Sequence, residues 1–357
     1  SPHLVTVRER IRISGQPIPK REFSRHLTHL RDVIEELIDS KILLSPPTYF
    51  EMLSCVAFLY FAKEQVDMAI LEVGMGGRFD ATNVVKPLVS AITTISPEHQ
   101  KFLGETQGEI ASEKAGIIKP GIPLVCGVEE REAFATIKKK ADELNAPFFA
   151  VFSKNRRLYT ERTTHNFRFE YKLGKDVYAY APSLRGEHQG KNSAIAIAIA
   201  LKLSKDGRPL EKTRIIKGVE GARWPGRLEV VSKNPLVLID GAHNEEGARA
   251  LRKYVREFVA PPRVLIFAVM RDKNIAKLSE ILFPLAHRVI CTKFPYFKAA
   301  SPEDILNQAS QFKDRIVIQA DVQKAVKTAL RFASSDGVVL VAGSLFLVGE
   351  IKKIFTA

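Results

Sequence analysis

The sequence predicts an α/β protein with two domains, a larger one built on a mostly parallel sheet and a smaller α/β domain at the C-terminal end. Short apolar runs rich in β-branched residues alternate with amphipathic stretches of helical period, which is the pattern of βαβ units. The chain has 357 residues, whereas a single hydrophobic core stops growing near about 250–300 residues. We expect the domains to span residues 1–226 and 227–357, with the boundary at the Pro225-Gly226 break.

Strands and helices are expected to alternate in the first domain. Apolar residues recur at spacings of three and four over residues 21–39, which predicts an amphipathic helix. The β-branched residues of 88–95 predict a strand. We expect helices over residues 21–39, 47–65, 106–115 and 130–144, and strands over residues 68–73, 88–95, 123–126 and 148–152.

The pattern changes in the second half of this domain. Apolar and polar side chains alternate between residues 157 and 180 on both sides of Gly174, which predicts an antiparallel hairpin at a sheet edge. Residues 192–203 also alternate, but their alanines and the capping side chain of Asn192 favour a buried helix. In the second domain, helices are expected between strands over residues 236–240, 264–268, 289–292, 316–319 and 338–341.

The composition narrows the class of partner. The formal net charge of +14 suits either nucleic acid or anionic small molecules. The sequence has no zinc-finger spacing, aromatic-plus-basic module or dense basic tail, so we expect small anionic substrates and no nucleic acid; a merely solvated basic surface is the alternative. The most apolar run, residues 194–201, is far shorter than the ~20 residues of a membrane span, and the chain shows no signal peptide, so no membrane partner is expected.

The cysteines favour a reducing compartment. The chain has three, Cys55, Cys126 and Cys291, which lie far apart in or beside apolar runs. They form no zinc spacing, and their odd number leaves one unpaired in any disulfide scheme. We interpret them as reduced core residues of a cytoplasmic protein. We further expect a monomer.

The most informative segment follows the strand predicted over residues 68–73 and reads LEVGMGGRFDATN over residues 71–83. Glu72 lies at the end of the apolar run, where a buried carboxylate needs a partner. The glycines allow a ligand to approach the backbone closely, at the strand end where open α/β sheets bind ligands. The segment therefore predicts a site for a cation or a phosphate-bearing ligand. Its glycine spacing does not match a dinucleotide fingerprint.

Two further strand ends carry polar side chains. His99 follows the strand predicted over residues 88–95, and together with Glu72 it would suit a divalent cation. The alternative is a helix cap at Glu98 and a structural histidine. Residues 240–244 (DGAHN) place Asp240 and His243 at the end of the first strand of the second domain, which predicts a ligand-facing turn. The alternative there is a capped helix N-terminus.

Other candidates are less specific. Lys114, near the end of the helix predicted over residues 106–115, is by local reasoning a surface residue or a phosphate ligand. Residues 186–192 (GEHQGKN) do not form a P-loop, because the glycine spacing is one short and Asn192 replaces the Ser or Thr that binds magnesium. Gln189 and Asn192 can still recognise a polar edge such as that of a base. Arg227, after the Pro-Gly break, can contact phosphate from an interdomain cleft.

Taken in order, these segments resemble those of the folylpolyglutamate synthase/dihydrofolate synthase family, within the Mur ligase superfamily. The resemblance covers essentially the whole chain, and several motifs in order across two domains are a strong signal where one motif would be weak. It implies an ATPase-type first domain and a Rossmann-like C-terminal domain. The segments that carry it are residues 1–4, 8–11, 71–83, 98–104, 113–117, 188–192, 224–227, 240–244, 272–273 and 343–345.

The resemblance implies an ATP-dependent amide ligation. ATP phosphorylates a carboxylate of a folate or of dihydropteroate, and the amine of L-glutamate attacks the acyl phosphate. Glu72 and His99 would hold Mg²⁺, with Ser1 near the same site, and Mg²⁺ would neutralise the developing charge. Lys114 would be a catalytic lysine whose carbamylation converts it into a further metal ligand.

The resemblance also assigns the nucleotide site. Gln189, Asn192, Arg227 and Asp240 would contact ATP across the interdomain cleft. His243 would be a second catalytic residue, near phosphate or glutamate. The basic net charge suits ATP and acidic folyl substrates.

Two departures from the family pattern stand out. Glu98 replaces the usual Asp before the histidine, a conservative change. The family's opening strand and its Gly-Lys-Ser/Thr loop are not found within residues 1–357. We expect this loop to precede Ser1 in a longer enzyme, since backbone amides and a lysine cradle the phosphates there. Residues 1–357 alone are then expected to have little ligase activity and to expose apolar surface.

Three other functions compete with the folate ligase. The first is a non-catalytic homologue that natively lacks the phosphate loop and binds folate or a partner. The second is a cell-wall Mur ligase that adds amino acids to a nucleotide-sugar peptide, although residues 224–227 (WPGR) fit the folate branch better. The third, a nicotinamide oxidoreductase, is disfavoured by the glycine spacing.

Overall fold

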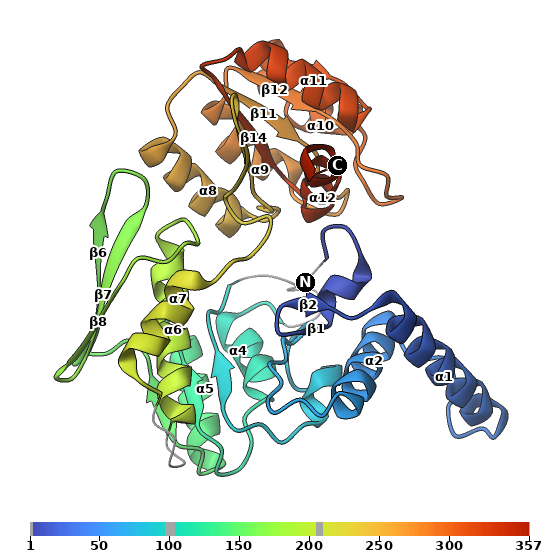
Figure 1. Cartoon of the computed structure of the whole chain (residues 1–357), viewed down its shortest axis with the longest axis vertical. Coiled ribbons are helices and arrows are strands. Elements are labelled where there is room, and N and C mark those ends of the chain that lie inside the picture. Colours follow the sequence, from blue (N-terminus) through green and yellow to red (C-terminus); the bar gives the residue numbers. More distant parts are fainter. Residues whose placement is uncertain (1–2, 97–103, 205–209, 357) are drawn as a thin grey trace.

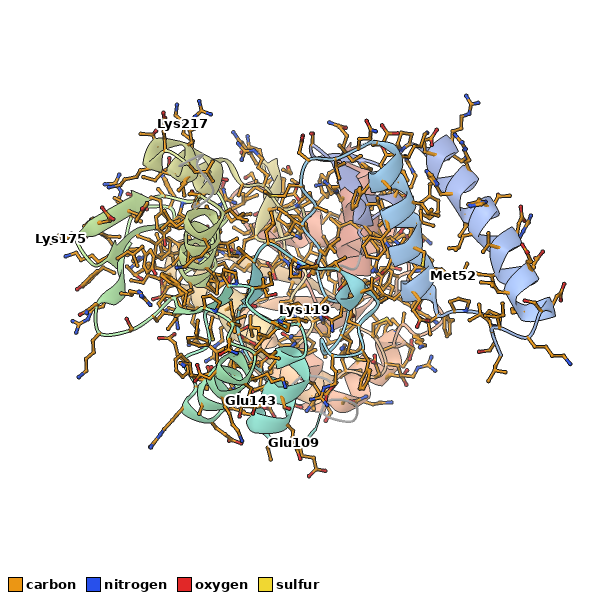
Figure 2. All side chains as sticks on the ribbon, turned by 90° about the horizontal axis from the view of Figure 1, so that it is seen from below. Met52, Glu109, Lys119, Glu143, Lys175 and Lys217 are labelled. Carbon is orange, nitrogen blue, oxygen red and sulfur yellow. The ribbon has the colours of Figure 1, made fainter. Side chains whose placement is uncertain are left out.

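The computed structural model describes residues 3–96, 104–204 and 210–356. Two α/β regions lie one above the other, and the N-terminal segment lies between them (Figure 1). Seen from below, Met52 of helix α2 (Tyr49–Lys63) lies on one side of the molecule and Lys175 and Lys217 on the other, with Lys119 between them (Figure 2). We call the two regions the N-terminal and C-terminal domains.

The N-terminal domain contains a small parallel sheet of order β3-β4-β5. Its helices begin where the sequence supplies caps: Thr48 and Glu51 form a capping box at α2, as Thr106 and Glu109 do at α4. The expected helices are confirmed, and so are the strands predicted over residues 88–95, 123–126 and 148–152, although β3 and β5 are shorter than predicted. The elements are η1 (Val7–Arg10), β1 (Arg12–Ile13), β2 (Gln16–Pro17), α1 (Lys20–Asp39), α2 (Tyr49–Lys63), η2 (Ala81–Val84), β3 (Ser90–Ile92), α4 (Gln107–Ala115), β4 (Leu124–Cys126), α5 (Arg131–Glu143) and β5 (Phe148–Ala150).

The strand predicted over residues 68–73 is wrong. This segment has no strand pairing in the described structure. Its apolar side chains are exposed, Met68 by 54% and Ile70 by 93%. A strand needs ladder hydrogen bonds from a neighbour, and among the described residues β3 pairs only with β4. Apolar composition alone therefore does not make this segment a strand. The exposure of its side chains agrees with the apolar surface that we expected.

The alternating segment forms a three-stranded antiparallel sheet of its own, of order β6-β7-β8. It is not a hairpin on the edge of the parallel sheet, as we had expected. Alternate side chains Phe167, Phe169 and Tyr171 are buried, and they share a hydrophobic cluster with helix α6. The strands are β6 (Arg156–Arg162), β7 (Phe167–Leu173) and β8 (Asp176–Tyr180), and the helices are α6 (His188–Leu203) and α7 (Lys212–Gly221).

The contact between α6 and β7 leads to a first prediction. A Cβ at Gly190 of α6 would lie 2.2 Å from Cε1 of Phe169. We expect Gly190→Ala to lower the free energy of unfolding by about 1–3 kcal/mol, because overpacking a filled core forces side chains to shift. The measurement is urea unfolding followed by circular dichroism.

Another helical glycine supplies the control. A Cβ at Gly218 of α7 meets nothing within 4 Å, so Gly218→Ala should stabilise the protein by up to about 1 kcal/mol through helix propensity. If both variants are equally stabilised, Gly190 does not pack against Phe169 in the folded protein.

The C-terminal domain is a doubly wound sheet of order β13-β12-β11-β14-β10-β9, in which only β9 is antiparallel to its neighbour. Two separate hydrophobic clusters cover its two faces, one with α8 and α9 and the other with α11 and α12. The five predicted strands are confirmed. The elements are β9 (Glu229–Lys233), β10 (Leu236–Ile239), α8 (Glu245–Phe258), β11 (Arg263–Phe267), α9 (Ile275–Leu282), η3 (Phe283–Leu285), β12 (Arg288–Cys291), α10 (Pro302–Gln308), η4 (Ser310–Arg315), β13 (Ile316–Ile318), α11 (Val322–Ala333), β14 (Val338–Ala342) and α12 (Leu345–Thr356).

All three cysteines are free. Cys126 and Cys291 are core residues, and burial raises the pKa of their thiols to about 11 and about 12. Cys55 is exposed, against expectation. The buried stripe of α2 contains Leu53, Val56 and Tyr60, and Cys55 lies off it. Within the described ranges, no helix combines the length and apolarity needed to cross a bilayer.

Candidate functional site

The glycine-rich segment is organised by one carboxylate, that of Asp80. Its Oδ2 accepts hydrogen bonds from the backbone N–H groups of Gly74 and Met75, at 2.9 and 3.1 Å. Its Oδ1 accepts from the N–H and the hydroxyl of Thr82, at 3.0 and 2.6 Å. Asp80 therefore closes the loop and caps the short helix η2 (Ala81–Val84). Both of its oxygens are occupied by these internal bonds.

The same segment packs on the end of helix α4. The N–H of Arg78 donates to the carbonyl of Glu113 at 3.0 Å, and the Asn83 amide donates to the carbonyl of Gly116 at 3.0 Å. A Cβ at Gly77 would lie 2.9 Å from the carbonyl oxygen of Lys114. The structure therefore brings together two motifs that are distant in sequence, residues 74–83 and the turn of α4 that contains Lys114.

Two of the predicted metal ligands belong to the described structure. Glu72 lies just before the glycine segment with its side chain exposed, and Lys114 lies in the last turn of α4. Ser1 and His99 lie outside the described residues. Within the part of the chain that is described, no three His, Cys, Asp or Glu side chains gather into a metal-binding group. These residues alone do not form a complete magnesium site, and the four predicted ligands stay a prediction.

Asp240 ties the interdomain linker to the sheet of the C-terminal domain. It is 9% exposed and lies directly after β10. Its Oδ2 accepts from the N–H of Leu228 and its Oδ1 from the N–H of Ala242, both at 2.9 Å. Burial raises the pKa of this carboxyl, while the two N–H donors and the nearby charge of Arg227 oppose the rise.

The residue after Arg227 links this turn to the start of helix α6, since the Leu228 carbonyl accepts from Arg185 Nη1 at 3.1 Å. Burial lowers the pKa of His188, and the nearby charge of Arg227 lowers it further. A chain of side-chain contacts begins at His188, whose Nε2 lies 3.1 Å from Nε2 of Gln189. It continues to Asn192, whose side-chain amide donates to Gln189 Oε1 at 3.2 Å. The predicted nucleotide residues Gln189, Asn192, Arg227 and Asp240 thus lie around one junction of the two domains.

A cavity of about 450 Å³ adjoins this junction between α6 and α7. Its walls are mostly apolar, with Leu184, Ala196, Ile215 and Val219 among them, and Gln189 and Asn192 supply amides. An apolar slot with a few polar groups is the usual form of a small-molecule site.

The turn that follows Asp240 orients His243. The Nδ1–H of His243 donates to the carbonyl of Gly241 at 2.8 Å, which leaves the lone pair of the ring on Nε2. The next residue, Asn244, caps helix α8 by accepting from the N–H of Gly247 at 2.8 Å. The alternative prediction for this segment, a capped helix N-terminus, is therefore also present, immediately beyond the candidate histidine.

The neighbouring strand β14 completes this face of the sheet. The N–H of Gly343 donates to the carbonyl of Ala242 at 2.8 Å, and α12 begins two residues later. Gly343 has φ of +110°, and a Cβ there would lie 2.5 Å from the carbonyl oxygen of Ala268. The turns after β10 and β14 thus lie side by side at the carboxyl edge of the sheet, where open α/β sheets bind ligands.

Reasoning from the sequence missed one polar residue at the junction, Glu229. Its Oε2 accepts from the N–H of Gly226 at 2.7 Å, and its Oε1 accepts from Lys352 of α12 at 2.5 Å. The Lys352 contact joins positions 123 residues apart. No local pattern in the sequence marks that pairing.

Comparison with known proteins identifies relatives over the whole chain. The family model of the Mur ligase middle domain matches residues 26–200, and that of the Mur ligase glutamate ligase domain matches residues 226–345. The dihydrofolate synthase/folylpolyglutamate synthase of Bacillus subtilis is 35% identical over 360 residues, which cover 99% of this chain and 82% of that protein.

Solved structures give the same result. A folylpolyglutamate synthase from Thermotoga maritima has 32% identity and a TM-score of 0.85, with 100% of this chain and 81% of that chain covered. A folylpolyglutamate synthase from Mycobacterium tuberculosis, complexed with ADP and AMPPCP, has 28% identity and a TM-score of 0.90, with 100% of this chain and 84% of that chain covered.

Proposed function

The chain belongs to the folylpolyglutamate synthase/dihydrofolate synthase family, and from this membership we propose that it joins L-glutamate to a folate or to dihydropteroate at the expense of ATP. The observation that carries the proposal is the junction of the two domains, where Asp240 accepts from the N–H of Leu228 and Arg185, just before α6, donates to the carbonyl of Leu228. The predicted nucleotide residues of both domains lie around this junction. We propose that the domain boundary lies between residues 226 and 227.

The residues at the junction suit an adenine nucleotide. The cavity between α6 and α7 offers apolar walls for the faces of a purine, with the amides of Gln189 and Asn192 available to its polar edge. Arg227 offers a guanidinium, which pairs well with phosphate. Asp240 accepts from the linker N–H of Leu228 and so holds Arg227, the preceding residue, in place.

The proposed reaction has two steps. A substrate carboxylate takes the γ-phosphoryl group of ATP, which makes it a good acyl donor. The amine of glutamate then attacks the acyl carbon, and phosphate leaves. His243 is the residue we propose to receive the proton of the attacking amine, because donation from Nδ1 to Gly241 leaves Nε2 as the acceptor.

We further propose that Ser1, Glu72, His99 and a carbamylated Lys114 bind Mg²⁺, which would supply charge neutralisation at the phosphates when bound. The proximity of the glycine segment to the Lys114 turn supports this proposal. The free cysteines support a cytoplasmic location, and we propose a monomer.

The direct test is ADP binding to residues 1–357 by isothermal titration calorimetry. We expect binding that Arg227→Ala weakens by about 10- to 100-fold, because a charge-assisted contact is worth roughly 1.5–3 kcal/mol. Arg223→Ala, an exposed arginine four residues earlier, is the matched control and should bind ADP as the wild type does. Equal affinities in wild type and Arg227→Ala would remove Arg227 from the site.

An assay of glutamate addition separates the competing functions. Folate, dihydropteroate and a nucleotide-sugar peptide are offered with ATP and labelled glutamate. Residues 1–357 contain no Gly-Lys-Ser/Thr sequence, so we expect a low rate, with the pterin substrates as acceptors. A high rate would contradict the expected need for that loop, and ADP binding without turnover would favour the non-catalytic homologue. Modification of the nucleotide-sugar peptide would favour the cell-wall ligase.

A further inference from the structure

Helix α8 of the C-terminal domain touches the N-terminal domain through its last turn. The ring of Phe258 meets that of Phe167 on β7 edge to face, with centroids 5.0 Å apart and planes at 86°. The guanidinium of Arg162 on β6 lies 5.2 Å from the Phe258 ring centroid. Its Nη2 donates to the carbonyl of Glu257 at 2.6 Å. An aromatic pair and a hydrogen bond thus join the domains at this end of α8.

Two contacts one turn earlier lie on the same face of the helix. The hydroxyl of Tyr254 donates to the carbonyl of His165 at 3.2 Å. Lys253 forms an ion pair with Glu187, the residue directly before α6. Because residues four apart on a helix are neighbours, positions 253, 254, 257 and 258 form one stripe. We call the contacts of this stripe with Arg162, His165, Phe167 and Glu187 the α8 contact.

The other end of α8 carries the candidate site. Asn244 caps the helix and follows His243, whose turn begins at Asp240. The end near the α8 contact is capped as well, since Arg263 Nη1 donates to the carbonyls of Val255 and Val259 at 3.2 and 3.1 Å. Helix α8 packs on the sheet of its own domain, and the His243 turn belongs to the same sheet edge. The α8 contact therefore helps to set where the C-terminal domain, and with it the His243 turn, lies relative to the N-terminal domain.

The α8 contact also includes the start of α6, on the other side of the junction. Glu187 immediately precedes His188 and Gln189, so its ion pair with Lys253 links the start of α6 to the helix that carries His243. The linker attaches the two domains at Leu228, where Arg185 Nη1 donates to the backbone carbonyl at 3.1 Å. The α8 contact is a second attachment, away from the linker in sequence, and it opposes rotation about the first.

We propose that Lys253 and Phe258 are positioning residues that hold the turn of His243 against the start of α6 and so assemble the nucleotide site. This role rests on the proposed function, because it assumes that ADP binds at the junction of the domains. When a site forms in only a fraction of the molecules, the apparent dissociation constant rises in proportion to the inverse of that fraction. Loosening the α8 contact should therefore weaken ADP binding without removing any group that touches ADP.

The first experiment measures domain arrangement and needs no ligand. Spin labels are attached to Glu143→Cys at the end of α5 (Figure 2) and to Gln323→Cys on α11, both exposed, in a Cys55→Ser background. Pulsed electron–electron double resonance should give a narrow distribution of distances between the two spin labels. The distribution should broaden in Phe258→Ala and stay narrow in Phe258→Tyr, which keeps the ring. Phe332→Ala, on α11 and 42% exposed, is the control and should leave the distribution unchanged.

The second experiment measures ADP affinity in the same proteins. We expect the dissociation constant of Phe258→Ala to rise by about fivefold to tenfold, with Phe258→Tyr and Phe332→Ala close to wild type. Lys253→Glu should weaken binding, and Lys253→Glu with Glu187→Lys should restore it. Far-ultraviolet circular dichroism and thermal melts of each variant show whether it is folded.

The outcomes separate the positioning role from the proposed function. An unchanged distance distribution in folded Phe258→Ala overturns the inference, as does a broadened distribution with unchanged ADP affinity. If the wild type binds no ADP, the proposed function and the positioning role both fail, whereas broadening in Phe258→Ala would still establish the α8 contact as a restraint between domains. Broadening together with weakened binding, both reversed in Phe258→Tyr, supports the inference.

Discussion

Replacing Asp240 by alanine is expected to lower the free energy of unfolding by about 2–6 kcal/mol and to abolish ADP binding. The two oxygens of Asp240 accept from the buried N–H groups of Leu228 and Ala242, and each buried donor left without a partner costs roughly 1–3 kcal/mol. The loss also releases the backbone that precedes His243 and follows Arg227. Urea unfolding and calorimetric titration with ADP measure the two effects.

Two further variants make this result specific. Asp240→Asn keeps one oxygen acceptor, so its loss of stability should be intermediate. Asp336→Ala removes an exposed aspartate just before β14 and should change stability by less than about 0.5 kcal/mol. If Asp240→Ala unfolds at the same urea concentration as the wild type, the carboxylate does not hold the linker and its place in the nucleotide site loses its support.

Replacing Lys114 by alanine is expected to remove a carbamate from the protein and to weaken magnesium binding by about tenfold or more, since even the outer-shell partners of a metal ion are worth roughly 10- to 100-fold in affinity. Carbamylation replaces the cationic head of the lysine with an anionic oxygen donor, the ligand type that Mg²⁺ prefers. We expect protein equilibrated with ¹³C-bicarbonate to show a carbamate carbon signal that Lys114→Ala lacks. Magnesium affinity is measured by calorimetry on the same samples.

Lys119 supplies the matched control. It lies five residues further along and donates from Nζ to the carbonyl of Asn83 at 2.8 Å, as an ammonium group does. Lys119→Ala should therefore keep the carbamate signal. A signal that survives in Lys114→Ala, or that never appears in the wild type, would leave Lys114 as an ordinary lysine and remove it from the proposed metal site.

Helices and fully buried strands could be read from the sequence because their determinants are local. Thr48 and Thr106 each precede a glutamate by three residues, and both start helices through capping boxes. β14 is buried at every position because helices cover both faces of its sheet, so it shows as an unbroken apolar run. Residues 68–73 show a similar apolar run. A strand also needs a neighbouring strand to pair with, and the apolar pattern of a segment does not indicate whether such a neighbour is present.

The candidate site shows the same difference between features set by the local sequence and features set by distant contacts. The sequence by itself determined the residue types that follow apolar runs, Glu72, Asp240 and His243, and through them the family and its expected chemistry. Only the tertiary structure decided which distant residues meet. Asp240 reaches Leu228, Glu229 reaches Lys352, and Phe258 reaches Phe167 across separations that no local pattern encodes. The physical reason is that caps and apolar periods act within a few residues. The first two of these contacts depend instead on how the sheet and helices of the C-terminal domain fold, and the third on how the two domains pack together.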